Sequence, residues 1–346
     1  MRLRQWRDLC VGSACLLSAL VAPALAAEEP RKSVVHVGVV ERPDLAPFVL
    51  ALYGGHFREQ GLDVEPVVGT SGQDFVSALA TGQMQVASGV PNAGLFNALN
   101  RGIDIRLVAD YAHVGPRPED STVSIIVRAD LIESGAVKTP ADLKGRTIAA
   151  GPSPGQYPQI LLSKALERGN LTLSDVTVRY LPFPEALAAL GTKTVDGSFM
   201  MEPLTTQGRR QNIARVLVPA GAVDPGAELS IVLYSPDFAK NVDVATRYMI
   251  GFLQGVRDYQ DAFFHQKNRD AAIAILTQHT ILKDPKAWME AIPQNTNPNG
   301  HINIDDLSRQ AVFYKAQGTL SGDIPELAKF VDPRFAEAAV KKLGTR

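Results

Sequence analysis

Cysteine is nearly absent from this 346-residue chain, since Cys10 and Cys15 are its only cysteines and both lie close to the amino terminus. The rest of the chain has no thiol for a disulfide, a cysteine metal site or a thiolate nucleophile. Net charge is also small, at −1 from 35 Lys and Arg against 36 Asp and Glu. This balance excludes a nucleic-acid binder that works by bulk positive charge, and the 45% hydrophobic content excludes a disordered chain.

Long apolar runs are missing too, except for one near the amino terminus. A basic start is followed by an apolar run from Leu9 to Ala22, and Ala24, Leu25 and Ala26 form a small-x-small cleavage pattern. A membrane anchor needs about 18–20 continuous apolar residues, whereas this run is shorter and is followed by Pro23. We therefore predict a secretory signal peptide over residues 1–26, whose removal takes both cysteines with it and leaves a soluble, exported protein.

What is present is a regular alternation of strand-like and helical segments. The predicted strands are 34–40, 62–68, 85–87, 146–150, 176–180 and 195–199. The predicted helices between them are 48–60, 74–80, 158–168 and 184–190. Alternation at this spacing predicts the α/β class, with mostly parallel sheets covered by helices.

Two extended apolar segments, residues 121–127 and 229–234, divide the chain into two lobes. Each is predicted to cross once between the lobes, and together they form a hinge, because a pair of adjacent strands allows bending but resists sliding. The first lobe is expected over residues 33–120 and 231–346, with the helical last third wrapped onto it. The second lobe is expected over residues 121–230.

A faint internal repeat accompanies this division. Residues 77–92 and 185–203 each show a short helix, a turn, a buried strand and a loop ending at or near a proline. Two related lobes produce such a repeat, and so does α/β patterning without a common origin.

Ligands of open α/β sheets bind outside the carboxyl ends of the strands, where loops lead into helices. In these loops, polar side chains can read the edges of a ligand, namely Ser71, Asn92, Ser153, Gln156 and Glu202. Aromatic and methionine side chains can enclose its body, namely Tyr111, Tyr157, Phe183, Met200 and Met201. Ser71 and Asn92 serve equally well as helix N-caps, and core packing is the alternative for the second group and the favoured one for Met200.

The sequence offers little for catalysis or metal binding, so we predict no catalytic, metal or cofactor site. Residues 151–155 fit the G-x-S-x-G pattern of a hydrolase, but Pro154 follows the serine and has no N–H for an oxyanion. The six histidines include no i,i+4 pair, and of these we consider only His113 a candidate for the ligand cleft. Glu202 is the sharpest polar candidate, because a carboxylate at a strand end favours a ligand N–H or cation, with Arg42 as a counter-charge.

The stretches 50–89, 139–157, 184–197 and 201–203 resemble the solute-binding proteins of ABC importers for sulfonates, taurine, nitrate and thiamine-precursor pyrimidines (the SsuA/THI5-like family). This resemblance implies a two-lobed periplasmic binding protein of type II, with two crossover strands. It adds Gly72 and Pro91 to the site. The residues predicted to bind ligand are Arg42, Ser71, Gly72, Pro91, Asn92, Tyr111, Ser153, Gln156, Tyr157 and Glu202.

The function expected from this resemblance is capture of a small organic solute in the periplasm and its delivery to an ABC permease and its ATPase. A monomer without nucleic-acid partners is expected. The solute is expected to be a neutral or amphoteric organic molecule, heteroaromatic or sulfonate-like, rather than nitrate or bicarbonate. Two alternatives stay open: an enzyme on the same fold that resembles a pyrimidine-precursor synthase, and a ligand-free sensory protein that contacts a receptor.

Overall fold

Alternating valines form the first strand of the chain. In the computed structural model, which describes residues 33–40, 43–69 and 74–346, β1 (Ser33–Val40) buries Val35, Val37 and Val39 and leaves Val34 exposed. This is the period-two pattern of a strand with one face on a core.

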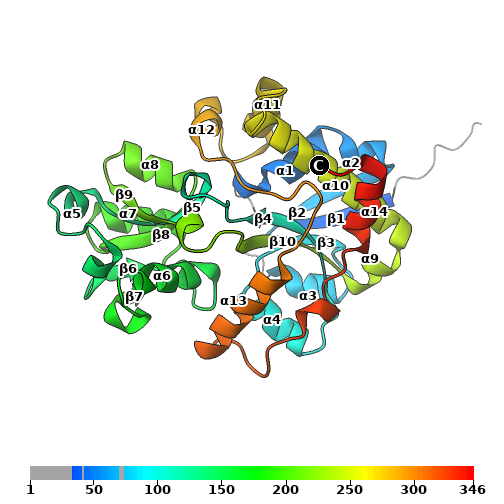
Figure 1. Cartoon of the computed structure of the whole chain (residues 1–346). Helices are drawn as coiled ribbons and strands as arrows, with labels where there is room; N and C mark the ends of the chain where they lie inside the picture. Colours follow the sequence, from blue (N-terminus) through cyan, green and yellow to red (C-terminus); the bar gives the residue numbers. More distant parts are fainter. Residues whose placement is uncertain (1–32, 41–42, 70–73) are drawn as a thin grey trace, which may run out of the picture. The chain divides into compact units, whose positions relative to one another are not determined.

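The strands form two five-stranded sheets, ordered β2-β1-β3-β10-β4 and β7-β6-β8-β5-β9 (Figure 1). The other strands of the first sheet are β2 (Leu62–Gly69), β3 (Val86–Gly89), β4 (Arg106–His113) and β10 (Glu228–Tyr234). The second sheet contains β5 (Val123–Arg128), β6 (Thr147–Ala149), β7 (Thr177–Arg179), β8 (Gly197–Met201) and β9 (Ala214–Pro219). Each sheet with the helices packed on it is called a lobe below, first and second in that order.

The two sheets are built in the same way. In each, four strands run in one direction and the fifth, β10 or β5, is antiparallel to both of its neighbours. The repeated segments 77–92 and 185–203 contain β3 and β8, which hold the same place in the two orders. The faint repeat in the sequence thus marks equivalent parts of two lobes.

The chain passes between the sheets twice, through residues 114–122 and 220–227. The two segments lie side by side, because Val114 N–H donates to the Ala227 carbonyl at 2.8 Å and Gly226 N–H donates to the Val114 carbonyl at 3.0 Å. Further along, Gly221 N–H donates to Ser121 Oγ at 2.8 Å.

The strands predicted to cross do not themselves cross. β5 is paired on both edges within the second sheet, and β10 is paired on both edges within the first. A strand held on both sides in one sheet has no free edge for the other sheet, so the irregular segments before the strands make the crossing. β10 begins at Glu228, three residues before the boundary expected at residue 231.

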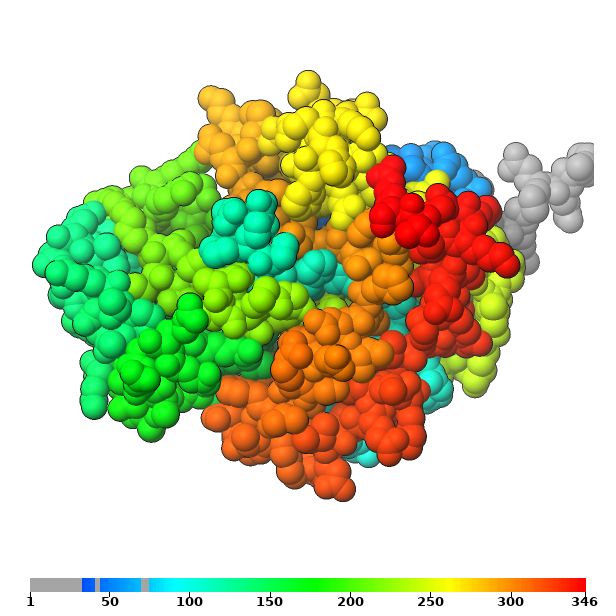
Figure 2. All heavy atoms as spheres, viewed as in Figure 1, coloured from blue at the N-terminus to red at the C-terminus, as the bar shows by residue number. Residues whose placement is uncertain are grey.

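Helices cover both sheets, and helices of the last third of the chain, coloured yellow to red, spread over the first lobe in the view of Figure 2. The helices of the first half are α1 (Ala46–Tyr53), α2 (His56–Glu59), α3 (Asp74–Ala80), α4 (Ala93–Asn100), α5 (Ala129–Glu133) and α6 (Tyr157–Glu167). Those of the second half are α7 (Phe183–Gly191), α8 (Leu204–Arg210), α9 (Pro236–Lys240), α10 (Val242–Phe263), α11 (Arg269–His279), α12 (Pro285–Glu290), α13 (Ile304–Ala316) and α14 (Arg334–Leu343). α13 packs against α4 of the first lobe and α6 of the second. Among the described residues, no helix has the length and apolar character of a membrane span.

Two local predictions have different outcomes. Asn92 caps α4 as predicted, since its Oδ1 accepts the Leu95 N–H at 2.8 Å. The single helix predicted over residues 48–60 is wrong, because α1 ends at Tyr53 and α2 begins at His56. Gly55 between them has φ of +92°, in the left-handed region that favours glycine and interrupts a helix.

Candidate functional site

A cavity of about 490 Å³ lies where strands of both sheets end. Val40, Val90, Pro152 and Glu202 line it, each at or just beyond the carboxyl end of a parallel strand. This is the usual place of a ligand in open α/β sheets, and the volume lies within the range of about 300–1,000 Å³ for small-molecule sites. The other described lining residues are Asp44, Asn92, Ala112, Thr122, Val123, Gln156, Tyr157, Pro158, Pro182, Phe183, Pro184, Phe199, Met201, Pro203, Leu229, Tyr259, Phe263, Leu282, Trp288, Ala291, Ile292, Pro293 and Gln294.

Aromatic rings from both lobes dominate this lining. In the second lobe, Phe199 lies between Phe183, with ring centroids 5.6 Å apart, and Tyr157, at 6.3 Å and nearly perpendicular. In the first lobe, Phe263 lies 4.7 Å from Tyr259 and 6.2 Å from Trp288. A ligand in the cavity therefore touches ring-bearing walls that belong to different lobes.

Glu202 follows β8 directly and brings a carboxylate to these rings. Its backbone N–H donates to the Thr122 carbonyl at 2.8 Å, which fixes the strand end against the first crossing segment. Its carboxylate Oε2 accepts a hydrogen bond from the Thr206 N–H, at 3.2 Å. Burial raises the pKa of Glu202, and the bonding from Thr206 and the charge of Arg209 offset this only in part.

The remaining polar lining is sparse. Asp44 adds a second carboxyl group, and Asn92, Thr122, Gln156 and Gln294 add neutral groups. Gln294 Nε2 donates to the Tyr111 carbonyl at 2.9 Å, and Asn92 Oδ1 caps α4, so each of these amides already has one of its polar atoms in a hydrogen bond within the protein. Over the described part of the lining there is no Lys, Arg, His, Cys or Ser.

Four of the residues predicted from the sequence meet at this cavity: Asn92, Gln156, Tyr157 and Glu202. The Tyr157 ring lines the wall while its hydroxyl donates to Asp224 Oδ2 at 3.2 Å, which holds the ring in place. Phe183 and Met201 also line the cavity, whereas Met200 is fully buried in the core, as favoured from the sequence.

Three predicted residues lie elsewhere. Tyr111 is buried with its ring 5.4 Å from Phe252, in the core of the first lobe, because its strand position faces the helices. Pro91 is buried, and its carbonyl accepts the Tyr314 hydroxyl at 3.3 Å. Ser153 is not among the lining residues, although its neighbour Pro152 is. Arg42, Ser71 and Gly72 lie outside the described residues, so their roles stay predictions.

The largest part that sequence reasoning missed comes from the last third of the chain. Tyr259, Phe263, Trp288 and Gln294 line the cavity, although this third was assigned only to cover the first lobe. Trp288 Nε1 donates to the Leu282 carbonyl at 3.0 Å, which orients the indole. The sequence signal for this contribution was the pair of aromatic residues 259 and 263, which lie one turn apart on one helix. The same spacing is typical of a helix face that packs on the core, so the sequence could not separate the two roles.

Buried carboxyl groups lie beside the cavity at the second crossing. Glu228 begins β10, and its Oε1 accepts the Asn303 N–H at 2.6 Å. Burial raises the pKa of Glu228 well above its usual range, and the neighbouring Asp110 raises it further through its charge and a shared hydrogen bond. Asp110 Oδ2 accepts from His113 Nδ1 at 3.0 Å, so His113 belongs to this polar cluster and does not line the cavity.

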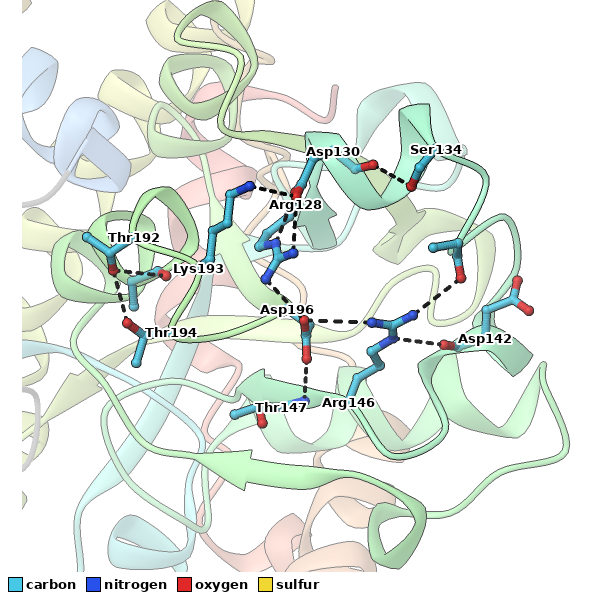
Figure 3. A network of polar contacts seen from close by, with 12 residues as sticks. Arg128, Asp130, Ser134, Asp142, Arg146, Thr147, Thr192, Lys193, Thr194 and Asp196 are labelled. Carbon is cyan, nitrogen blue, oxygen red and sulfur yellow. Dashed lines mark hydrogen bonds and ion pairs between the residues drawn. The ribbon is translucent and has the colours of Figure 1, made fainter.

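A different set of charges occupies the opposite end of the second sheet (Figure 3). Asp196, just before β8, accepts the Thr147 N–H at 3.0 Å and a hydrogen bond from Arg128 at 3.3 Å, and forms an ion pair with Arg146 at 3.9 Å. Arg128 also bonds Asp130 through both carboxylate oxygens. These bonds from Arg128, and one from Lys193, lower the pKa of Asp130 to about 2. The charges of this cluster are paired with one another, and the pairs connect β5, β6 and β8.

Comparison with known proteins agrees with this geometry. The family model described as NMT1/THI5 like matches residues 42–254. The alkanesulfonate-binding protein SsuA from Xanthomonas axonopodis pv. citri, bound to MOPS, is 20% identical with a TM-score of 0.67, over 89% of this chain and 100% of that one. The periplasmic nitrate-binding protein NrtA from Synechocystis PCC 6803 is 14% identical with a TM-score of 0.71, over 91% and 90%.

An enzyme shares the fold as well. The desulfurization enzyme DSZB is 14% identical with a TM-score of 0.61, over 90% of this chain and 99% of that one. No protein in the curated set matches the chain by sequence. The two-lobed periplasmic binding-protein fold expected from the sequence is confirmed, and so is the resemblance that led to it.

Proposed function

The chain belongs to the NMT1/THI5-like family, and from this premise we propose that it is the substrate-binding component of an ABC importer. It captures a small organic solute between its lobes and delivers the solute to a membrane permease driven by an ATPase. The observation that carries the proposal is the cavity of about 490 Å³ whose aromatic walls come from both lobes. A site divided in this way is complete only when the lobes are together.

The mechanism follows from that division. A solute that contacts only one wall does not distinguish an open from a closed arrangement, whereas contacts with Phe183 and Phe199 on one side and Tyr259 and Trp288 on the other stabilise the closed one. The crossing segments 114–122 and 220–227 are the places where the lobes can bend. Delivery then requires the permease to recognise the closed form.

Export to the periplasm is part of the same proposal. The basic start, apolar run and cleavage pattern of residues 1–26 support a cleaved signal peptide. We propose lobe boundaries close to those of the two sheets, and a monomer as the working form, since one chain supplies both walls.

An enzyme of the same fold is the alternative that a specific observation favours, because DSZB is among the structural neighbours. Against it, the described lining of the cavity offers no cysteine, serine, histidine or lysine as a nucleophile or base. Incubation of the protein with candidate solutes, followed by mass analysis, separates the two functions, since a binding protein returns each solute unchanged.

The main test is native mass spectrometry of the protein purified gently from the periplasm of its own host. A discrete added mass that disappears on denaturation is expected, and re-addition of that molecule should raise the melting temperature. A clean unliganded mass, without a thermal shift across sulfonates, pyrimidines, amines and carboxylates, contradicts the proposal and favours a receptor-contact protein.

A further inference from the structure

The charges of the cavity are one-sided. Its described lining carries the carboxyl group of Glu202 and no basic side chain, in a surface made mostly of rings, prolines and aliphatic groups. A delocalised anion is bound most strongly by a guanidinium or an ammonium group, whereas the side-chain amides of the described lining, Asn92, Gln156 and Gln294, are neutral donors. The lining therefore disfavours the class of solute that the names of SsuA and NrtA indicate.

We infer that the solute is an organic cation, an amine or protonated nitrogen heterocycle on an apolar, ring-bearing body, and that Glu202 binds its positive group. This inference rests on the proposed function, because it names the solute of the same cavity. It replaces the neutral or amphoteric, heteroaromatic or sulfonate-like solute expected from the sequence with a single charge class.

The surroundings of Glu202 supply the first argument. Oε2 accepts the Thr206 N–H at 3.2 Å, and the Thr206 side chain also bonds the carboxylate, so its hydrogen bonds from the described residues come from one neutral residue of α8. This carboxylate is half-buried between the crossing segment and apolar side chains and has lost water, and Thr206 and the charge of Arg209, which lies outside the lining, compensate for this only in part. An ammonium or protonated ring N–H that donates to the carboxylate supplies a charged partner.

The ring walls supply the second argument. The faces of Trp, Tyr and Phe carry partial negative charge and attract cations, with Trp the strongest. Trp288, Tyr259 and Phe263 of the first lobe and Phe183, Phe199 and Tyr157 of the second enclose the same space. A cation is attracted by these ring faces and by the Glu202 carboxylate together, whereas an anion of the same shape is repelled by both.

Probes of one shape and different charge test the inference. Phenethylamine, 2-phenylethanol and 2-phenylethanesulfonate share a phenylethyl body and carry charges of +1, 0 and −1 at neutral pH. Calorimetric titration of the unliganded protein should give an affinity for the amine at least tenfold above that for the alcohol, and a weaker affinity for the sulfonate. Sulfonate or alcohol binding that exceeds amine binding overturns the inference and leaves the solute-binding function intact.

Variants assign the preference to Glu202. Glu202→Gln should lower the ratio of the amine affinity to the alcohol affinity (the amine-to-alcohol ratio) about tenfold, with the alcohol affinity within twofold of that of the starting protein. Glu202→Asp should still bind the amine more tightly than the alcohol. The matched control is Glu185→Gln, which removes the same charge from the exposed face of α7 outside the cavity. An unchanged ratio in a folded Glu202→Gln protein also overturns the inference.

A molecule that co-purifies with the protein gives a second readout independent of the probes. Its mass spectrum in both polarities reports whether it carries a basic nitrogen, so an acidic molecule without one overturns the inference even if no probe binds. Where neither a probe nor a co-purified molecule is detected, both the inference and the proposed function fail. Arg42→Gln, which removes the positive charge predicted for the site, should bind the amine at least as tightly as before.

Discussion

Strand β8 has an acidic residue at each end, and the two residues differ in nearly everything except their charge. Asp196, before the strand, receives a backbone N–H and hydrogen bonds or ion pairs from Arg128 and Arg146. Glu202, after the strand, receives one N–H from Thr206 and is otherwise surrounded by the lining of the cavity. The first carboxylate is paired with two arginines, whereas the burial of the second is offset only in part by Thr206 and the charge of Arg209.

This difference distinguishes a structural acid from a binding acid. Arg128 and Arg146 bring positive charge to Asp196, and the Thr147 N–H donates to it, so the side chain joins β5 and β6 to the start of β8. Ionised Glu202 destabilises the empty protein, because burial raises its pKa and the compensation is partial. A residue of this kind suits a binding site, because a ligand that supplies a partner for its charge removes the destabilisation and so gains binding free energy.

The largest expected effect removes the structural acid. Asp196→Ala should lower the free energy of unfolding by about 2–3 kcal/mol, because Arg128, Arg146 and the Thr147 N–H lose their shared partner. Urea denaturation measures this, and the amine-to-alcohol ratio of the folded fraction should not change. Asp130→Asn, on the exposed side of the same cluster, should cost less, and equal losses in the two variants would contradict the distinction.

Glu228 is a third kind of acid, because the group beside it is not a cation but another carboxyl group, that of Asp110. Its folded pKa is raised above the ordinary 4.5, so the stability that its proton provides is present below 4.5 and is lost as pH rises through the folded pKa. Glu228→Gln keeps the acceptor for Asn303 and supplies a permanent donor to Asp110. Its gain in unfolding free energy should reach about 2 kcal/mol at pH 8 and vanish below pH 4. A gain independent of pH would show that the carboxyl group is not the cause.

The apolar wall beside Glu202 gives a smaller effect on binding. Phe183→Ala should weaken binding of a cavity ligand roughly tenfold, because one ring of the second-lobe wall is lost. Calorimetric titration with phenethylamine measures this change. Val216→Ala, an exposed apolar residue on β9, is the control and should leave binding unchanged.

The smallest effect concerns the stability of the empty protein. Glu202→Gln should raise its unfolding free energy by less than about 1 kcal/mol at pH 8, since the residue is half-exposed and water screens its charge. Because the folded pKa is raised, the gain should appear as pH rises through that pKa and be absent below 4.5. Destabilisation of the empty protein at pH 8 would place Glu202 with Asp196 as a structural acid.

Short-range patterns carried most of the fold. The alternation of Val35, Val37 and Val39, and the N-cap at Asn92, depend on neighbouring residues and were predicted correctly. The break at Gly55 was missed because glycine in a helical pattern does not reveal its φ. The positions of the two crossings between the sheets were predicted wrongly. An apolar segment predicts a strand, but it does not indicate in which sheet that strand pairs.

The site was only partly predictable for the same reason. Tyr157 follows β6 and Glu202 follows β8, and the topology of the sheet brings both positions to the cavity. Tyr111 lies on β4, whose residues 107–112 are buried on both faces, so the sequence does not tell which side of the sheet each side chain enters. Trp288 reaches the cavity from a segment far along the chain, and no local pattern reports such a contact.

The place of β10 also determines the order in which a growing chain can fold. The five strands of the second lobe are complete once Pro219 has been made, and that lobe is one continuous stretch. The first lobe begins earlier, but the gap between β3 and β4 is filled only when synthesis reaches Tyr234. A chain halted between these two points would hold a finished second lobe and an open first sheet, so the lobe that is started first is completed last.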